Sequence, residues 1–299
     1  MSFDLNVIIF LSFLIINLAL GLWSSRGVTN IKEYAVGNRD FNTGTLVAAI
    51  VALWVSGEFF ATIVTESYKD GLIFMSILVA DFFSYVFIGQ FFAPRLHEFL
   101  GKISIAEAMG GLYGERVRVI TAISGFIGVS GVIAIQLQIA GLLFEYALGI
   151  SVSYGIIISG IIITLYSSLG GIKAVTFTDV IQFLTFGIVI PSIGLMLFAK
   201  FGNESVIDVL SMSPKFSFSE SFSFANERIY YFASLFLWLL IPAFAPAVFQ
   251  RISMAKDVTQ VRHSFVIAAF VGAFLAAVIC WIAMLLLSKY PNLEGDDIF

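Results

Sequence analysis

The chain has 299 residues, of which 59% are hydrophobic and 12% charged, and its mean hydropathy is +0.98. A soluble domain carries about 25% charged residues, so lipid must be part of the solvent of this chain. The formal net charge of -4, without a basic stretch, argues against a nucleic-acid partner, and the single cysteine, Cys280, excludes an internal disulfide.

A helix needs about 20 apolar residues to cross the hydrocarbon core of a bilayer. Eight segments meet this requirement and predict an all-α membrane protein: 5–23, 43–66, 71–92, 119–149, 152–168, 176–199, 229–250 and 263–288. The first segment is interpreted as a true span, because no basic region precedes it and no small-residue cleavage site follows it.

Basic residues are distributed unevenly among the loops. Of the 16 Lys and Arg residues, 11 fall in the loops 24–42, 93–118, 169–175 and 251–262, which lie on one side if all eight spans cross. Because cytoplasmic loops are enriched in Lys and Arg, both chain ends are predicted outside. The one long polar loop, 200–228, is then external. Its alternating segment 216–224 fits an aromatic collar at the headgroup level better than a short strand.

Inserting an ionisable group in the middle of a span costs about 2.5–3.5 kcal/mol, so such a group indicates a function by default. Glu58 lies in the middle of the second span, directly after Ser56-Gly57. Glycine weakens the helix there, and a broken helix at the membrane midplane frees backbone carbonyls for a cation. Asp81 and Glu145 lie in the third and fourth spans, where pairing to a neighbouring helix explains them equally well.

The seventh span contains a comparable break. Pro242 and Pro246 remove intrahelical hydrogen bonds within it. Interrupted helices in corresponding positions of two halves are typical of the substrate site of secondary transporters. Ordinary proline kinks remain the alternative for this span.

The segment from Gly170 to Gln182 is the strongest local signal. Gly170-Gly171 permit a tight reversal, and Thr176 and Thr178 could cap the sixth span where it begins. Asp179 follows them beside the predicted helix start, where it either has a plain capping role stabilised by the helix dipole or lies at the cytoplasmic mouth through which a cation leaves.

The pattern Gly-Gly-x-x-Ala-Val-x-x-Thr-Asp-x-x-Gln over 170–182 resembles the signature of the sodium/solute symporter family. The segment 33–39 resembles the first cytoplasmic loop of that family, and Gln250-Arg251 with 255–257 resembles the loop after its second broken helix. The resemblance covers roughly 20–265. The resemblance is to a family of sodium/proline, pantothenate and sugar carriers, and the chain is expected to be sodium/proline symporter-like.

The resemblance implies a leucine-transporter-like inverted-repeat fold, present in part. Residues 5–23 would form the peripheral helix, 43–199 the first five-helix repeat, and 229–288 the first two helices of the second repeat, all in one transporter domain over 1–299. Family members continue for several more helices, so the chain resembles a truncated or split product, and a second chain could supply the missing helices.

The resemblance also implies sites for sodium, the coupling ion, with no other cofactor. The sodium-binding residues would be Ala52 and Val55, through their carbonyls, and Asp179, implicated in sodium release. The substrate-binding set would comprise Ser56, Gly57, Glu58, Phe59, Asp81, Gln136, Trp238 and Ile241. Trp54 stands where proline carriers place an aspartate, and Phe59 where sugar carriers place a glutamine. The sequence therefore leaves the substrate open.

Three functions are consistent with the sequence. The first is sodium-coupled symport of a small polar solute, such as an amino acid or a carboxylate, across the inner (plasma) membrane by alternating access. The second is a transporter-like input module of a histidine kinase, and the third is an inactive fragment. An enzyme is not expected, because no nucleophile-base pair, metal cluster or phosphate-binding glycine loop is visible.

Overall fold

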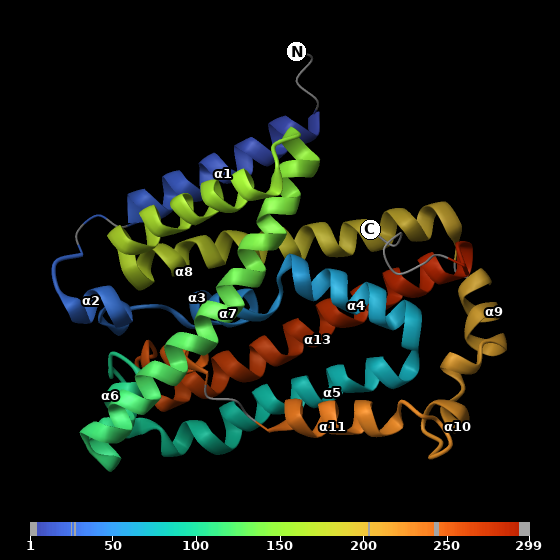
Figure 1. The fold of residues 1–299 in the computed structure, drawn as a ribbon. Helices are drawn as coiled ribbons and strands as arrows, with labels where there is room; N and C mark the ends of the chain where they lie inside the picture. The colour runs from blue at the N-terminus through green and yellow to red at the C-terminus, as the bar shows by residue number, and fades with distance from the viewer. Residues whose placement is uncertain (1–4, 25, 27, 203, 242–244, 293–299) are drawn as a thin grey trace. The chain divides into compact units, whose positions relative to one another are not determined.

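The structure is a computed structural model and describes residues 5–24, 26, 28–202, 204–241 and 245–292. Over these residues it is built of helices that follow one another in the order of the predicted spans (Figure 1). They cluster in two compact units, each assembled from three stretches of chain. The first unit contains Met1–Ala49, Arg95–Gln182 and Phe244–Val261, and the second contains Ile50–Pro94, Phe183–Ala243 and Arg262–Phe299.

Every predicted span has a helical counterpart. In the described part of the chain, five helices are long and apolar enough to cross a membrane, and a bent pair adds a sixth. These are α1 (Leu5–Ser24), the stretch Leu72–Arg95 that begins with α5 (Leu72–Phe87), α7 (Glu115–Leu148), α8 (Val152–Phe201), α13 (Val258–Lys289), and the pair α3 (Thr43–Trp54) and α4 (Gly57–Asp70). With 50 residues, α8 is long enough for two spans and covers both 152–168 and 176–199. The short helices α11 (Ile229–Leu240) and α12 (Pro246–Ser253) occupy the predicted seventh span.

The reversal within α8 occurs at Gly171, as predicted. Gly171 has φ 52° and ψ -141°, a conformation that glycine adopts at little cost, and the chain doubles back there (Figure 1). The predicted loop 169–175 is wrong in extent, because the second half of α8 is already helical at Ile172. Thr176 and Thr178 consequently lie inside the helix and cap nothing. The Thr178 hydroxyl instead donates to the Val175 carbonyl oxygen at 2.8 Å.

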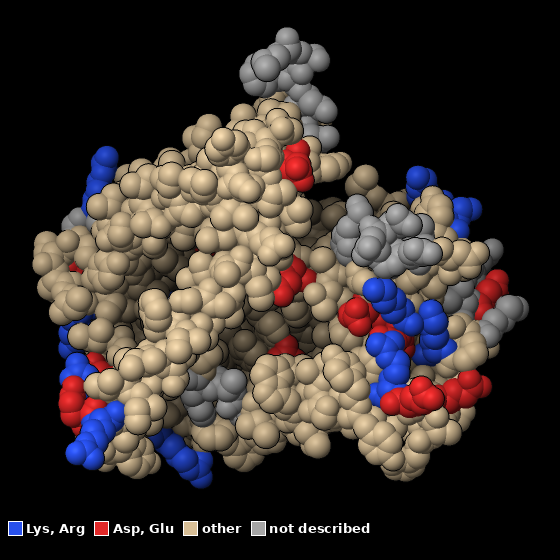
Figure 2. All heavy atoms as spheres, viewed as in Figure 1, with Lys and Arg blue, Asp and Glu red and all other residues tan. Residues whose placement is uncertain are grey.

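In the first unit, α1 packs along the first half of α8, with Gly21 against Tyr166 (Figure 1). The α7 helix joins them through an edge-to-face contact of Phe144 with Phe10, whose ring centroids are 5.0 Å apart. The central part of α7 carries no charged residue over 119–144, and its surface is uniformly tan in Figure 2. Such an exposed apolar helix is suited to lipid or to further helices.

The four predicted cytoplasmic loops meet within the first unit. The short helices α2 (Ile31–Val36), η1 (Gly37–Arg39) and α6 (Ile105–Tyr113) lie in them. The Arg39 Nε donates to the Ala255 carbonyl at 2.7 Å, and the Gly101 amide donates to the Ser253 carbonyl at 3.0 Å. Lys173 forms an ion pair with Glu33. If all eight predicted spans cross the membrane, these four loops lie on the same side, and the contacts among them agree with that arrangement.

In the second unit, α13 supplies much of the buried core, with Leu275, Ile279 and Leu285 at 1% exposure or less. The α11 helix packs along α5, where the ring centroids of Phe74 and Phe232 are 6.5 Å apart. The predicted external loop contains α9 (Glu204–Met212), η5 (Pro214–Phe216) and α10 (Phe218–Ser221). Because 218–221 is helical, the strand alternative for 216–224 is wrong.

Candidate functional site

The second span is broken where Ser56-Gly57 predicted it. The α3 helix ends at Trp54, α4 begins at Gly57, and the two are bent by 55°. Ser56 has extended backbone and acts as the N-cap of α4, because its hydroxyl oxygen accepts from the Phe59 amide at 3.1 Å. A serine cap followed by glycine thus starts a new helix inside the span.

The break exposes two helix ends of opposite polarity. The last carbonyls of a helix have no intrahelical partner and carry partial negative charge. Ala52 lies in the last turn of α3, and Val55, 1% exposed, lies in the break itself. Carbonyl oxygens in this position can coordinate a cation such as sodium. Glu58, half-buried in the first turn of α4, lies beside the partially positive helix start.

An aromatic and acidic cluster adjoins the break. The Trp54 indole stacks on the Tyr85 ring, with centroids 4.1 Å apart and planes 11° apart, and lies 6.2 Å from the Phe59 ring. The Asp81 carboxylate is hydrogen-bonded to the Trp54 side chain. The structure therefore brings Phe59 and Asp81 around Trp54. Sequence reasoning missed Tyr85, although its spacing of four residues from Asp81 on a helix was a usable signal.

Asp179 lies in the first unit, where its partner is Arg251. The Arg251 Nη2 donates to the Asp179 Oδ2 at 2.7 Å, and the two side chains are 3% and 12% exposed. The Arg251 Nε also donates to the Ala49 carbonyl oxygen at 3.4 Å. The capping interpretation of Asp179 is wrong, because α8 is helical from Ile172 onwards and an arginine already satisfies the carboxylate. Arg251 belongs to the Gln250-Arg251 segment that resembles the family, but from the sequence it was considered only as one of the basic residues of the loop 251–262.

The remaining predicted site residues are spread over both units. Gln136 is half-buried on α7 of the first unit. Trp238 and Ile241, at the end of α11 in the second unit, are each 68% exposed. The helix is interrupted between Leu240 and Pro246 as predicted, but Pro242 lies outside the described residues.

Comparison with known proteins establishes the family. The model of the sodium:solute symporter family matches residues 34–296. The chain is 25% identical to a sodium/glucose cotransporter of Vibrio parahaemolyticus, over 98% of this chain and 57% of that protein. It is 24% identical to the human high affinity choline transporter 1, over 91% of this chain and 48% of that protein. The chain belongs to the sodium:solute symporter family.

A solved structure establishes the fold. The substrate-bound outward-open state of a Na+-coupled sialic acid symporter superposes with a TM-score of 0.85 at 18% identity, over 99% of this chain and 64% of that one. The predicted leucine-transporter-like all-α fold is thereby confirmed, and the chain is a multi-pass membrane protein of a family of transporters rather than enzymes. The chain spans little more than half the length of the Vibrio relative.

Proposed function

We propose that this chain carries sodium-coupled symport of a small polar solute by alternating access in the inner (plasma) membrane. The observation that carries the proposal is the break between α3 and α4, with the Trp54, Asp81 and Tyr85 side chains against it. Unpaired helix ends within a span are costly in lipid unless they line a site. One charge moving inward through 100 mV releases about 2.3 kcal/mol, which is enough to concentrate a solute.

Sodium is proposed to bind the carbonyl oxygens of Ala52 and Val55 and to pass Asp179 on release. Arg251 occupies the Asp179 carboxylate in this structure. A cation that reaches Asp179 must therefore displace the guanidinium or share the carboxylate with it. Exchange between Arg251 and sodium would make release a gated step, because each cation lowers the affinity of the carboxylate for the other.

The solute is proposed to bind beside the break, to Ser56, Gly57, Glu58, Phe59 and Asp81, with contributions from Gln136, Trp238 and Ile241. The stacked rings and the acidic groups favour a solute with a positively charged end, since a cation is attracted both to a carboxylate and to the face of an aromatic ring. An amino acid has such an end, and the human choline transporter is among the relatives. A carboxylate bound through its other end remains compatible with the α4 helix start.

The repeat organisation is part of the proposal. Residues 5–23 are assigned to a peripheral helix, 43–199 to the first five-helix repeat, 200–228 to the external loop and 229–288 to the first two helices of the second repeat. The interruption between α11 and α12 then corresponds to the break between α3 and α4. Two interrupted helices in equivalent positions support a shared midplane site.

Uptake into sealed vesicles tests the function. Vesicles containing the purified chain are given an inward sodium gradient and labelled proline, alanine, choline or pyruvate, with an equal potassium gradient as the control. Uptake of one solute that requires sodium supports the proposal. Equal uptake in both gradients, from protein shown to be inserted, contradicts it.

A further inference from the structure

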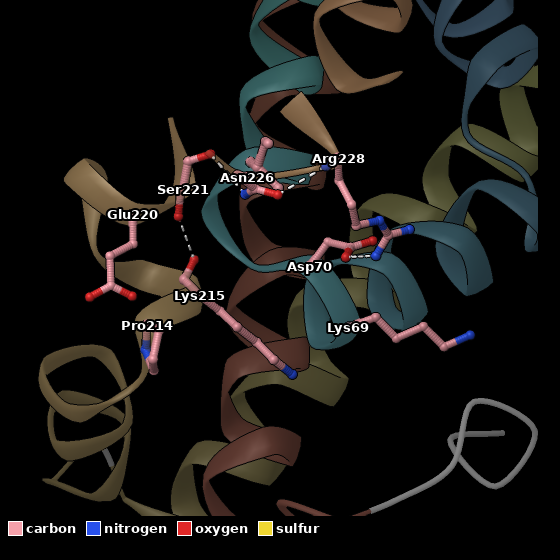
Figure 3. Close-up of a pocket in the computed structure, with 9 residues that line it drawn as sticks. Lys69, Asp70, Pro214, Lys215, Glu220, Ser221, Asn226 and Arg228 are labelled. Atoms are coloured by element: carbon pink, nitrogen blue, oxygen red, sulfur yellow. Dashed lines mark hydrogen bonds and ion pairs between the residues drawn. The ribbon is translucent and has the colours of Figure 1, made fainter. Parts of the chain in front are cut away.

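At the end of α4, an acidic group of the second unit is neutralised by the protein itself (Figure 3). A cavity of about 230 Å³ lies there, between the α4 terminus, the first turn of α5 and the 214–228 segment. Asp70 forms an ion pair with Arg228, and the Lys215 Nζ donates to the Tyr68 carbonyl oxygen at 3.3 Å. Because these groups already have partners within the chain, they are not available to a ligand.

Asp81, on α5 of the same unit, has a partner of a different kind. Its carboxylate accepts a hydrogen bond from the Trp54 side chain, whose indole N–H carries no charge. A carboxylate with a neutral donor keeps its negative charge for a ligand, whereas an ion pair cancels it. Because the indole N–H holds the carboxylate, the position of the Trp54 ring fixes the direction in which Asp81 points.

The Trp54 ring is held by two helices of the second unit, α5 and α13. It stacks on Tyr85 of α5, with ring centroids 4.1 Å apart. Tyr85 in turn stacks on Phe265 of α13, with ring centroids 6.0 Å apart. The indole also reaches Gly272 of α13. Because Phe265 and Gly272 are seven residues apart, they lie on the same face of α13, so one helix face supports both rings.

Gly272 is buried inside a helix of 32 residues, where glycine is a poorer helix former than alanine. The Trp54 ring accounts for its presence. A Cβ at this position would lie 2.7 Å from the Trp54 Cζ3 and 2.9 Å from its Cε3, well inside the normal contact distance of two carbon atoms. These two atoms belong to a rigid ring, so the whole ring would have to move. Glycine at position 272 therefore admits the indole to its place on Tyr85.

We propose that Gly272 is a positioning residue of the transport site: by admitting the Trp54 ring, it aims the Asp81 carboxylate at the positively charged end of the solute. This inference rests on the proposed function and extends the site to α13, from which the sequence predicted no site residue. A methyl group added at Gly272 would push the indole away from Asp81 or from Tyr85. The carboxylate would then lose its fixed direction, and the affinity for the solute would fall although the charge itself is retained.

A spectroscopic measurement tests the positioning without any transport. The full chain is labelled with fluorotryptophan in lipid nanodiscs, and the fluorine NMR signals of its four tryptophans are recorded. Trp54→Phe identifies the Trp54 signal by its loss. Gly187→Ala is the matched control, because a Cβ there meets open space and should shift no signal. Gly194→Ala places a Cβ 3.1 Å from Trp281 and should shift the signal of that residue instead.

Gly272→Ala should shift the Trp54 signal. Asp81→Asn should also shift it in the parent chain, because the hydrogen bond to the indole changes. This second shift should be much smaller when Gly272→Ala is already present, since the displaced N–H then no longer meets the carboxylate. An unchanged Trp54 signal in Gly272→Ala, or an Asp81→Asn shift of equal size in both backgrounds, would overturn the proposal.

Uptake tests the consequence for the solute. For each of labelled proline, alanine and choline that the parent chain transports, Gly272→Ala should raise KM about tenfold with a smaller change in kcat, because a charged contact to the solute is weakened. In the Trp54→Phe background, whose shorter ring leaves room for the methyl group, the same substitution should change KM by less than about twofold. An unaltered KM, an equal effect in both backgrounds, or transport of pyruvate alone, which has no positive end, would overturn the proposal.

The double variant also covers a failure to fold. If Gly272→Ala does not fold, the chain that carries Trp54→Phe as well should fold, because the shorter ring removes the clash. A double variant that is equally unfolded would overturn the proposal. A parent chain that transports none of the solutes contradicts the proposed function, while the fluorine signals still decide whether Gly272 positions Trp54 and Asp81.

Discussion

The Arg251 guanidinium and the Asp179 carboxylate form a buried ion pair, with Nη2 and Oδ2 2.7 Å apart. The pair joins α12 to the second half of α8 within one compact unit. The Arg251 side chain, only 3% exposed, can be buried in this way because Asp179 and the Ala49 carbonyl compensate its charge. The family resemblance implicates Asp179 in sodium release. In this structure its carboxylate is already paired with a positively charged side chain, that of Arg251.

Removing one partner of this pair is expected to be strongly destabilising. Asp179→Asn or Arg251→Gln leaves the other charge buried and unpaired, which costs about 3–5 kcal/mol. The double variant should recover part of this loss, because neither charge then remains. Thermal unfolding in detergent measures all three, and equal destabilisation of single and double variants would show that the pair is not coupled. If the Asp179→Asn protein still folds and transports, its turnover should be lower than that of the parent chain, because sodium is released more slowly without the carboxylate.

Glu58→Gln should change the KM for the transported solute, because it removes a charge at the start of α4 beside the break. The shape of the side chain is retained, so the change reports on charge. Glu98→Gln serves as the control, since the Glu98 side chain is 67% exposed. An unaltered KM in the Glu58 variant would assign this residue to packing.

Trp54 and Asp81 should be energetically coupled. Trp54→Phe keeps a ring over Tyr85 but removes the indole N–H that Asp81 accepts, and Asp81→Asn removes the charge. A double-mutant cycle on solute affinity or unfolding is expected to give a coupling of about 0.5–3 kcal/mol. Trp23→Phe, at an exposed position on α1, is the control. Additive effects would place Asp81 outside the cluster.

Gly171→Ala should destabilise the protein, because alanine at φ 52° costs about 1–2 kcal/mol and its Cβ would lie 2.4 Å from the Tyr34 carbonyl oxygen. Gly160→Ala is the matched control in the same helix, where a Cβ meets open space. That substitution should be neutral or stabilising, since alanine is the better helix former. Comparable unfolding temperatures for both variants would refute the tight reversal.

The Glu33–Lys173 ion pair should make stability depend on pH. The side-chain hydrogen bond from Lys173, with a further bond from the Thr29 amide, lowers the pKa of Glu33 below its ordinary value. A lowered carboxyl pKa contributes stability that is present above the unfolded-state pKa of about 4.3 and is lost as the pH falls through the folded value. Unfolding between pH 6 and 3 (roughly two units around that pKa) measures the loss. Glu33→Gln should show a flatter profile, and a slope identical to the parent chain would exclude the pair as its cause.

Most of the fold could be predicted from the composition and from short local sequence signals at helix breaks and reversals. Long apolar runs predicted the helices, Ser56-Gly57 predicted the break, and Gly170-Gly171 predicted the reversal, because each depends on residues close together in the chain. The start of the helix after Gly171 was misplaced, since Thr176 and Thr178 resemble caps in sequence but lie inside a helix that needs no cap there.

The partners of the acidic groups could not be predicted. Asp179 and Arg251 are separated by 72 residues, and Trp54 belongs to a different helix from Asp81. Helix periodicity says which residues share a face but not which faces meet. The cavity at the end of α4 likewise depends on a loop whose path is set by tertiary contacts with Tyr68 and Gly71.

The measurement that tests sodium coupling most directly is solute-dependent sodium flux. Vesicles containing the chain are given radioactive sodium on the outside, with or without the solute that is taken up best on that same side, and the entry of sodium is followed. The account predicts that sodium entry rises when the solute is supplied on the same side, and that Asp179→Asn reduces this increment. Sodium flux that is indifferent to every solute, from protein shown to be folded and inserted, would contradict it.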